Sequence, residues 1–345
     1  MMKGLIYISV CALAFTLLLT GCISAGKSST KVNLRDVIQS DPATVVGKLP
    51  GNTSPGEGWN YINDAGGGDV IDWATEEDYF FIENDKARFH IGINTFPMDE
   101  KDPFGSGIFA KGSTLPGTVV DAVEKTHLIE NLDFTEFVLL PIDATDHRNW
   151  WYPWHKLRLP DISINEEDKS ISARGTWDYR NNIQANVKYS MVQDAPMLKI
   201  DVTLENTSNN NFRGDLGYIF YLYNPRGSGT ASVRNGYIPG QGWFIGGVPS
   251  PANGGSALYY GWKGNYVMMG RAEGYSGETC HAIIWGGAQP PRALIPSGYY
   301  TGAWFRVNVP AKESTTVTFL HLVYHPERGE EAFEQAAHWA AEVNK

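Results

Sequence analysis

The sequence predicts a mostly β protein, an antiparallel sandwich or barrel that ends in one short helix. From Asp78 onward the dominant hydrophobic period is two, which is typical of antiparallel strands with one face in the core. Stretches rich in Gly and Pro separate the strand candidates, as in "NPRGSGTASVRNGYIPGQGW". No repeat of about twenty to fifty residues is visible, which disfavours a propeller or a solenoid.

The clearest strands are 182–192 ("NIQANVKYSMV") and 197–206 ("MLKIDVTLEN"), in which apolar and polar residues alternate. Turn-forming residues lie between them, so we expect a hairpin. The other strand candidates are 79–83, 88–94, 134–140, 170–177, 216–223, 266–271, 281–285, 303–309 and 315–324. The helix is expected in the last segment, 327–345, where apolar residues recur with helical spacing.

The N-terminal segment, 1–21, predicts export. A single cation, Lys3, precedes an apolar or small-residue run, which is typical of a secretory signal peptide and short for a membrane span. The run ends in Leu-Thr-Gly-Cys, which resembles the lipobox of prokaryotic lipoproteins, so Cys22 is expected to be lipidated. An ordinary signal peptide followed by a chance cysteine is the alternative.

Residues 22–58 are rich in Ser, Gly, Thr and Pro, with a weak helical pattern near 32–38, and are interpreted as a lipidated tether. Residues 59–345 are then a single β domain. The expected location is the cell envelope or surface, outside the cytoplasm, with the membrane contacted through the lipid anchor.

The net charge is −10 and the sequence contains no Lys/Arg run, so a basic surface for nucleic-acid phosphates is not expected. Nucleic acid is therefore not an expected partner. Cysteines are few. Cys11 leaves with the signal peptide and Cys22 carries the lipid, which leaves Cys280 and no disulfide within the mature chain. Stability must therefore come from a packed core.

Three segments resemble the galactose mutarotase-like superfamily: "YFFIENDKARFHI" (79–91), "VKYSMVQDAPMLKIDVTLENTS" (187–208) and "VNVPAKESTTVTFLHLVYH" (307–325). The resemblance implies a large antiparallel two-sheet β-supersandwich whose concave face often binds carbohydrate. In true aldose mutarotases two histidines and a glutamate act on the sugar. These are not carried over, because no Asn-His motif precedes the centre of the chain and the only His-Pro pair is His325-Pro326.

An aromatic stretch, "HRNWWYPWHKL" (147–157), is the first candidate binding site. It follows an apolar strand and contains Pro153, which predicts a loop. Flat aromatic faces suit the C–H faces of sugars. The expected ligand contacts are Arg148, Trp150, Trp151 and Trp154. The alternative is that Trp150 and Trp154 plug the end of the sandwich while Trp151 and Tyr152 point outward.

A second aromatic and glycine-rich region, 236–262, contains Trp243 and Trp262. Glycines allow the backbone to approach a ligand closely, so this region is expected to line the same groove as the first. The alternative is a long loop whose aromatic residues, including Tyr237, Tyr259 and Tyr260, cover the core.

No catalytic constellation has a recognisable spacing, so catalytic residues stay unknown, with His147, His155 and Asp178 as weak candidates. A metal site at His147 and His155 lacks a complete ligand set, and no metal or cofactor is expected. Carboxylates near turns could form a glycosidase pair or be solvated: Asp143, Asp146, Asp178, Asp215, Glu273 and Glu278.

Two further residues are expected to be structural rather than catalytic. Cys280 and His281 are neighbours on a strand and point to opposite faces, so they cannot form a thiolate pair with each other. Cys280 is expected to be a small buried hydrophobe. His321 lies in the last apolar strand and is expected to be a satisfied core histidine.

Three functions fit these observations. The first is a surface-anchored lipoprotein that binds an oligo- or polysaccharide through an aromatic groove. The second is a carbohydrate-active enzyme, a glycosidase, lyase or epimerase, on the same scaffold. The third is a structural subunit that docks another envelope protein. Binding ranks first because aromatic residues are abundant whereas a catalytic arrangement is not evident.

Overall fold

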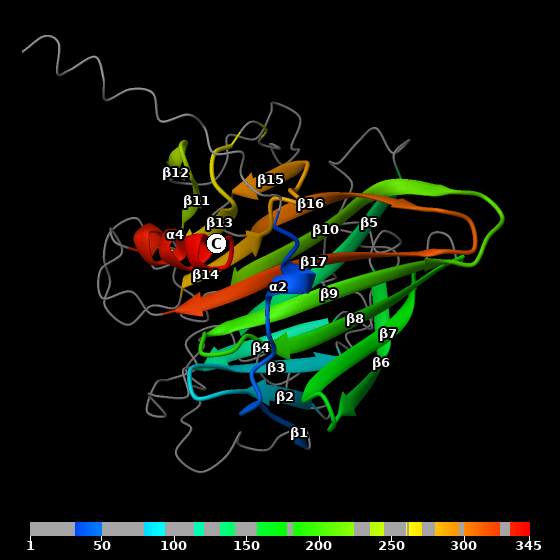
Figure 1. Cartoon of the computed structure of the whole chain (residues 1–345), viewed down its shortest axis with the longest axis horizontal. Helices are drawn as coiled ribbons and strands as arrows, with labels where there is room; N and C mark the ends of the chain where they lie inside the picture. Colours follow the sequence, from blue (N-terminus) through cyan, green and yellow to red (C-terminus); the bar gives the residue numbers. More distant parts are fainter. Residues whose placement is uncertain are drawn as a thin grey trace, which may run out of the picture.

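The computed structural model describes residues 32–49, 79–93, 114–120, 132–141, 157–177, 182–223, 235–244, 260, 262–270, 280–296, 300–324 and 332–345. Within them the protein is mostly β, and all strand pairs are antiparallel. A short helix, α4 (Ala332–Glu342), lies near the C-terminus. The predicted fold class is confirmed (Figure 1).

One layer is a nine-stranded sheet (Figure 1). Its strands, in spatial order, are β12 (Gly242–Phe244), β11 (Asn235–Ile238), β13 (Tyr266–Gly270), β14 (Cys280–Trp285), β17 (Ser314–Tyr324), β9 (Met197–Asn206), β8 (Ile183–Met191), β7 (Ser170–Trp177) and β6 (Leu157–Asn165). β12 and β6 are therefore at opposite edges of this sheet.

The second layer consists of two four-stranded sheets. One contains β1 (Val45–Leu49), β2 (Tyr79–Glu83), β3 (Arg88–Ile93) and β4 (Thr114–Val120) in that order. The other contains β15 (Ala293–Pro296), β16 (Tyr300–Val309), β10 (Phe212–Tyr223) and β5 (Leu132–Pro141) in that order. β4 lies beside β5, so the two sheets meet along these strands.

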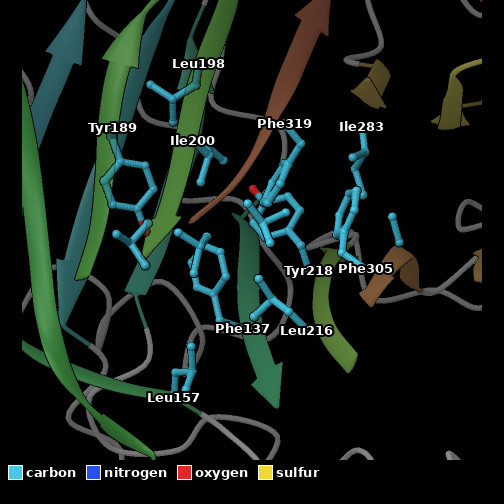
Figure 2. Close-up of a cluster of buried hydrophobic side chains, with 14 of the residues drawn as sticks. Phe137, Leu157, Tyr189, Leu198, Ile200, Leu216, Tyr218, Ile283, Phe305 and Phe319 are labelled. Carbon is cyan, nitrogen blue, oxygen red and sulfur yellow. The ribbon is translucent and has the colours of Figure 1, made fainter. Parts of the chain in front are cut away.

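The main core fills the space between the layers. Apolar side chains from all three sheets form this inter-sheet core; among them Tyr189, Ile200 and Phe319 come from the large sheet, and Phe137 and Leu216 from the sheet opposite (Figure 2). Phe305 of β16 stacks on Phe319, with the ring centroids 5.2 Å apart. Aromatic pairs of this kind add to the stabilisation that burial provides.

A second apolar cluster covers the other face of the large sheet. β14 illustrates the division, because Ile283 and Trp285 belong to the inter-sheet core whereas Cys280, Ala282 and Ile284 belong to the second cluster. Helix α4 and the short helix α2 (Leu34–Val37) lie over this face, in front of β14, β17 and β9 in Figure 1. The large sheet is therefore buried on both sides along its central strands.

The predicted central hairpin is formed by β8 and β9, whose residues pair from Ile183 with Asn206 to Met191 with Leu198. Its turn places Asp194 at a φ of 56°, a left-handed conformation that Asp tolerates better than most residues. Asn206, at the far end of the hairpin, donates from its side chain to the carbonyl of Val309 at 3.1 Å. This bond ties the hairpin to β16 of the opposite layer.

Two longer strands that the sequence did not predict contain proline in their interior, which removes a backbone donor. β4 contains Pro116, and β6 contains Pro160 at a point where its register with β7 shifts between Arg158 and Asp161. The other unpredicted strands are β1, β11, β12 and β15, each with five residues or fewer. Short strands give too few positions for a period to be recognised.

The interpretation of 22–58 as a tether is wrong for residues 32–49. β1 pairs with β2 along its length, from Val45 with Glu83 to Leu49 with Tyr79. Leu34 of α2 is only 2% exposed and belongs to the second cluster. The amino group of Lys199 donates to the carbonyl of Arg35 at 3.1 Å, which supports the end of α2. This segment therefore belongs to the folded structure.

Replacing Leu34 tests that assignment. Leu34→Ala should lower the free energy of unfolding of the full-length protein by about 2–4 kcal/mol, because it opens a cavity under α2. Val37, in the same helix, is 52% exposed, so Val37→Ala should change it by less than about 0.5 kcal/mol. Urea unfolding followed by fluorescence measures both. Equal stability of the two variants would mean that α2 is not part of the folded structure.

Candidate functional site

Most of the sequence-predicted site residues lie outside the described residues. These are His147, Arg148, Trp150, Trp151, Trp154, His155 and Asp178, the carboxylates Asp143, Asp146, Glu273 and Glu278, the tyrosines Tyr152 and Tyr259, and Cys22. Their assignments stay predictions. The described residues include Trp243, Trp262, Asp215, Cys280 and His321.

The strands that flank the first aromatic stretch end at the same place in the sandwich. β5 ends at Pro141, which pairs with Gly214 of β10. β6 begins at Leu157, which is buried in the inter-sheet core and pairs with Trp177, the last residue of β7. The Trp177 ring packs edge-on against Phe212, the first residue of β10, with centroids 5.3 Å apart. The beginning of β10 is therefore adjacent to both strand ends.

This end of β10 is tightly packed against β5. A Cβ added to Gly214 would lie 2.3 Å from the carbonyl oxygen of Leu140, which no real side chain tolerates. Glycine is therefore required there for the two strands to approach closely. The beginning of β10 therefore holds the last residues of β5, up to Pro141, in a fixed position.

Asp215, the next residue of β10, is a buried carboxylate held by two arginines. The Arg292 Nη1 donates to its Oδ2 and the Arg306 Nε to its Oδ1, both at 2.6 Å. The Asp215 side chain is 3% exposed, whereas those of Arg292 and Arg306 are 40% and 41% exposed. We call these three residues the arginine cluster. The candidate acid is thus neither solvated nor available to a substrate.

Trp243 lies on the helix-covered face of the large sheet. It packs edge-on against Tyr237 of β11, with ring centroids 5.1 Å apart. Tyr237 in turn stacks on Phe333 of α4 at 4.9 Å. All three are partly buried against the second cluster. Trp243 therefore helps to hold α4 against the sheet.

Trp262 packs against the opposite face. It is partly buried against the inter-sheet core and lies edge-on to Trp285, with centroids 6.2 Å apart. Trp243 and Trp262 thus pack against different clusters, on opposite faces of the sheet. The expectation that one groove is lined by both is wrong, because the two clusters cover opposite faces of the large sheet.

The strands of the second aromatic region are also separated from β6 by the width of the large sheet. β11, β12 and β13 form one edge, whereas β6, which begins at Leu157, forms the other. The strand ends that flank residues 147–157 therefore lie away from Trp243 and Trp262. The sequence could not indicate this, because strand order is not encoded in local hydrophobic periodicity.

A buried polar network connects the layers. The Tyr218 hydroxyl of β10 lies 2.7 Å from Nδ1 of His321, and Nε2 of His321 lies 2.9 Å from Nδ1 of His281 (Tyr218 is labelled in Figure 2). His281 is 0% and His321 1% exposed. Burial, and secondarily the nearby His281, holds the pKa of His321 well below its ordinary value. His321 is therefore neutral in the folded protein.

The expectation for His321 as a satisfied core histidine is confirmed, and Cys280 is buried at 1% exposure, also as expected. The participation of Tyr218 and His281 was not expected. Tyr218 occupies an inward position of the predicted strand 216–223, but its partner lies 103 residues away in sequence. Only the packing of the two layers brings these groups together.

Within the described ranges no group of three or more His, Cys, Asp or Glu side chains is arranged to hold a metal ion. Over the same residues no helix is long and apolar enough to cross a membrane.

No family model and no curated protein sequence matches the chain. Among solved structures, it is similar to a galactose mutarotase-like protein from Lactobacillus casei (10% identity, TM-score 0.40, covering 71% of this chain and 100% of that one). A galactose mutarotase related enzyme from Lactobacillus acidophilus has 11% identity and a TM-score of 0.37, covering 71% of this chain and 97% of that one. An α-galactosidase from Geobacillus stearothermophilus, solved in complex with raffinose, has 10% identity and a TM-score of 0.37, covering 72% of this chain and 41% of that one.

The buried His321 makes stability depend on pH. The unfolded chain binds a proton at this histidine below about pH 6.5, whereas the folded chain does not, so the free energy of unfolding decreases as the pH falls below that value. The contribution is about 1.4 kcal/mol per pH unit. His321→Gln should remove this slope in urea unfolding of the full-length protein between pH 7.5 and 5.

The matched control is His338→Gln, which replaces an exposed histidine of α4 outside the network. It should leave the pH dependence as in the wild type. An unchanged slope in His321→Gln would show that this histidine is not buried in its neutral form.

Proposed function

We propose that the protein binds an oligo- or polysaccharide at the end of the sandwich where β5, β6, β7 and β10 meet. The observation that carries the proposal is the convergence of Pro141, Leu157 and Trp177 on the beginning of β10. In the sequence, the aromatic stretch lies between Pro141 and the first residues of β6, and Asp178 directly follows Trp177. In this proposal, the same end of the scaffold carries both.

The chemistry of the stretch suits a sugar. Indole rings offer flat apolar faces for the C–H surface of a pyranose, and Arg148 and Asn149 offer hydrogen-bond donors for its hydroxyl groups. Loops that are anchored on a rigid scaffold commonly carry binding residues. The superfamily that the sequence resembles binds carbohydrate on its concave face, which agrees with this choice of ligand.

Binding is favoured over catalysis. Asp215, the described member of the candidate carboxylates, is buried under two arginines and is therefore unsuitable as a catalytic acid. Among the described residues no observation favours a glycosidase, a lyase or an epimerase. The aromatic stretch therefore defines a binding site in this proposal.

We also propose that the protein is a lipoprotein of the cell envelope or surface, lipidated at Cys22 and outside the cytoplasm. The Leu-Thr-Gly-Cys sequence supports this. Because the folded part includes Val32, at most ten residue steps separate it from Cys22, a reach of about 36 Å when fully extended. The domain would then lie close to the membrane rather than at the end of a long tether.

Cys22→Ser tests the anchor. In a bacterial host that processes lipoproteins, the wild type should sediment with membranes and the variant should appear in the soluble fraction, because the diacyl modification is lost. Mass spectrometry of the N-terminal peptide should detect two acyl chains on the wild type. Membrane association of an unmodified Cys22→Ser chain would contradict lipid anchoring.

Replacing Trp150 and Trp151 together by alanine tests the binding site. The double variant should lose at least about tenfold in affinity for the bound glycan, because the stacking surface is removed. Affinity electrophoresis of the full-length protein through gels that contain individual polysaccharides measures this loss, and near-ultraviolet circular dichroism reports the fold.

The matched control is Tyr260→Ala. It removes an aromatic side chain that is 57% exposed and does not belong to the stretch 147–157. It should bind as the wild type does. Loss of the folded spectrum in the tryptophan double variant would favour the core-plug alternative. A folded double variant with full affinity would refute the site.

A further inference from the structure

The arginine cluster lies on the face of β10 and β16 that is turned away from the inter-sheet core. Phe212 and Leu216 of β10, and Phe305 and Val307 of β16, point into that core. Residues between them point the other way, because side chains alternate along a strand. Asp215 accordingly pairs directly with Arg306 across the two strands.

Arg213 extends the cluster along the same face. It lies two residues before Asp215 on β10, pairs with Asn308 of β16, and is exposed. Among the described residues of this face, Arg213, Arg292 and Arg306 contribute three positive charges and Asp215 one negative charge, a difference of two. The chain as a whole carries a net charge of −10, so this patch has the opposite sign to the protein.

Neutralising the buried Asp215 does not require this arrangement. One arginine balances the charge of one carboxylate, so charge neutrality alone does not require a second guanidinium. Here the acid is withdrawn and the two cations stay about 40% exposed. The second guanidinium, and Arg213 beyond it, leave positive charge directed at solvent.

The hydrogen bonds to Asp215 orient the two guanidinium groups before an anion binds. Each uses one N–H to bind Asp215, and a guanidinium has five N–H donors in a rigid planar fork. The carboxylate fixes both forks before any ligand arrives, which reduces the entropy lost on binding. Planar, paired N–H groups of this kind bind carboxylate and sulfate oxygens bidentately.

The position of the arginine cluster beside the end of β5 indicates the class of glycan. Asp215 pairs with Leu140 of β5, next to the Pro141 strand end from which the aromatic stretch begins. We infer that Arg213, Arg292 and Arg306 bind the anionic group, a carboxylate or a sulfate ester, of an acidic polysaccharide. This inference rests on the proposed carbohydrate binding and specifies the class of glycan.

Matched pairs of glycans test the inference on the full-length protein in detergent. Polygalacturonate is compared with its carboxyl-reduced form, and dextran sulfate with dextran, by affinity electrophoresis at low salt. The wild type should bind at least one acidic form about tenfold more tightly than its neutral partner, and added NaCl should reduce the difference. The pair that shows the preference identifies carboxylate or sulfate as the recognised group.

Arg292→Gln and Arg306→Gln should each lower the affinity for the acidic form at least about fivefold and leave that for the neutral form unchanged, whereas Arg306→Lys should retain part of the preference. Arg213→Gln leaves Arg292 and Arg306 on Asp215, so it stays informative if loss of either of these two arginines unfolds the protein. Arg174→Gln, an exposed arginine of β7, is the control and should behave as wild type.

The outcomes are distinct. A preference for the acidic form that is lost in the cluster variants and kept in Arg174→Gln supports the inference. Equal affinity for the acidic and neutral forms, or a preference that all cluster variants keep, overturns it and leaves the proposed carbohydrate binding in place. Absence of binding to every glycan overturns both.

Discussion

Burial of the large sheet on both faces is the constraint on which the rest of the structure depends. Every residue of β14 is buried, as are the last eight of β17, so these strands cannot have one face in water. One face is covered by the two four-stranded sheets and the other by α2 and α4. Without both covers, apolar surface that contributes about 25 cal/mol per Å² on burial would be exposed.

Buried polar groups are stabilised in two different ways, according to where they lie. His321, between the layers, is stabilised in its neutral form by partners on both ring nitrogens, the Tyr218 hydroxyl and His281. Asp215, on the far face of β10, accepts hydrogen bonds from two guanidinium groups, which replace the water it has lost. A neutral network suits the closed core, whereas an ion cluster suits a place where the cations reach solvent.

The same arrangement separates features that look alike in the sequence. Trp243 and Trp262 both lie in one glycine-rich region, yet the first supports α4 and the second closes the inter-sheet core. Of the strands beside the first aromatic stretch, β6 lies at the opposite edge of the large sheet and β5 ends next to Asp215 of the arginine cluster. The proposed binding site is therefore at the end of the sandwich where β10 begins, rather than in one groove lined by all aromatic residues.

The sequence by itself determined the strands with clean alternation, including 170–177, the β8–β9 hairpin and the C-terminal helix, because periodicity is a local property. It also determined that Cys280 and His321 are buried. Tertiary structure alone decided that residues 32–49 join the fold and that Tyr218 contacts His321. It also decided that the proline-containing strands β4 and β6 pair with β3 and β7, respectively. It also decided that Arg292 and Arg306 meet on Asp215. These are contacts between residues distant in sequence, and no local pattern specifies which distant strand a segment will pair with or which face will be covered.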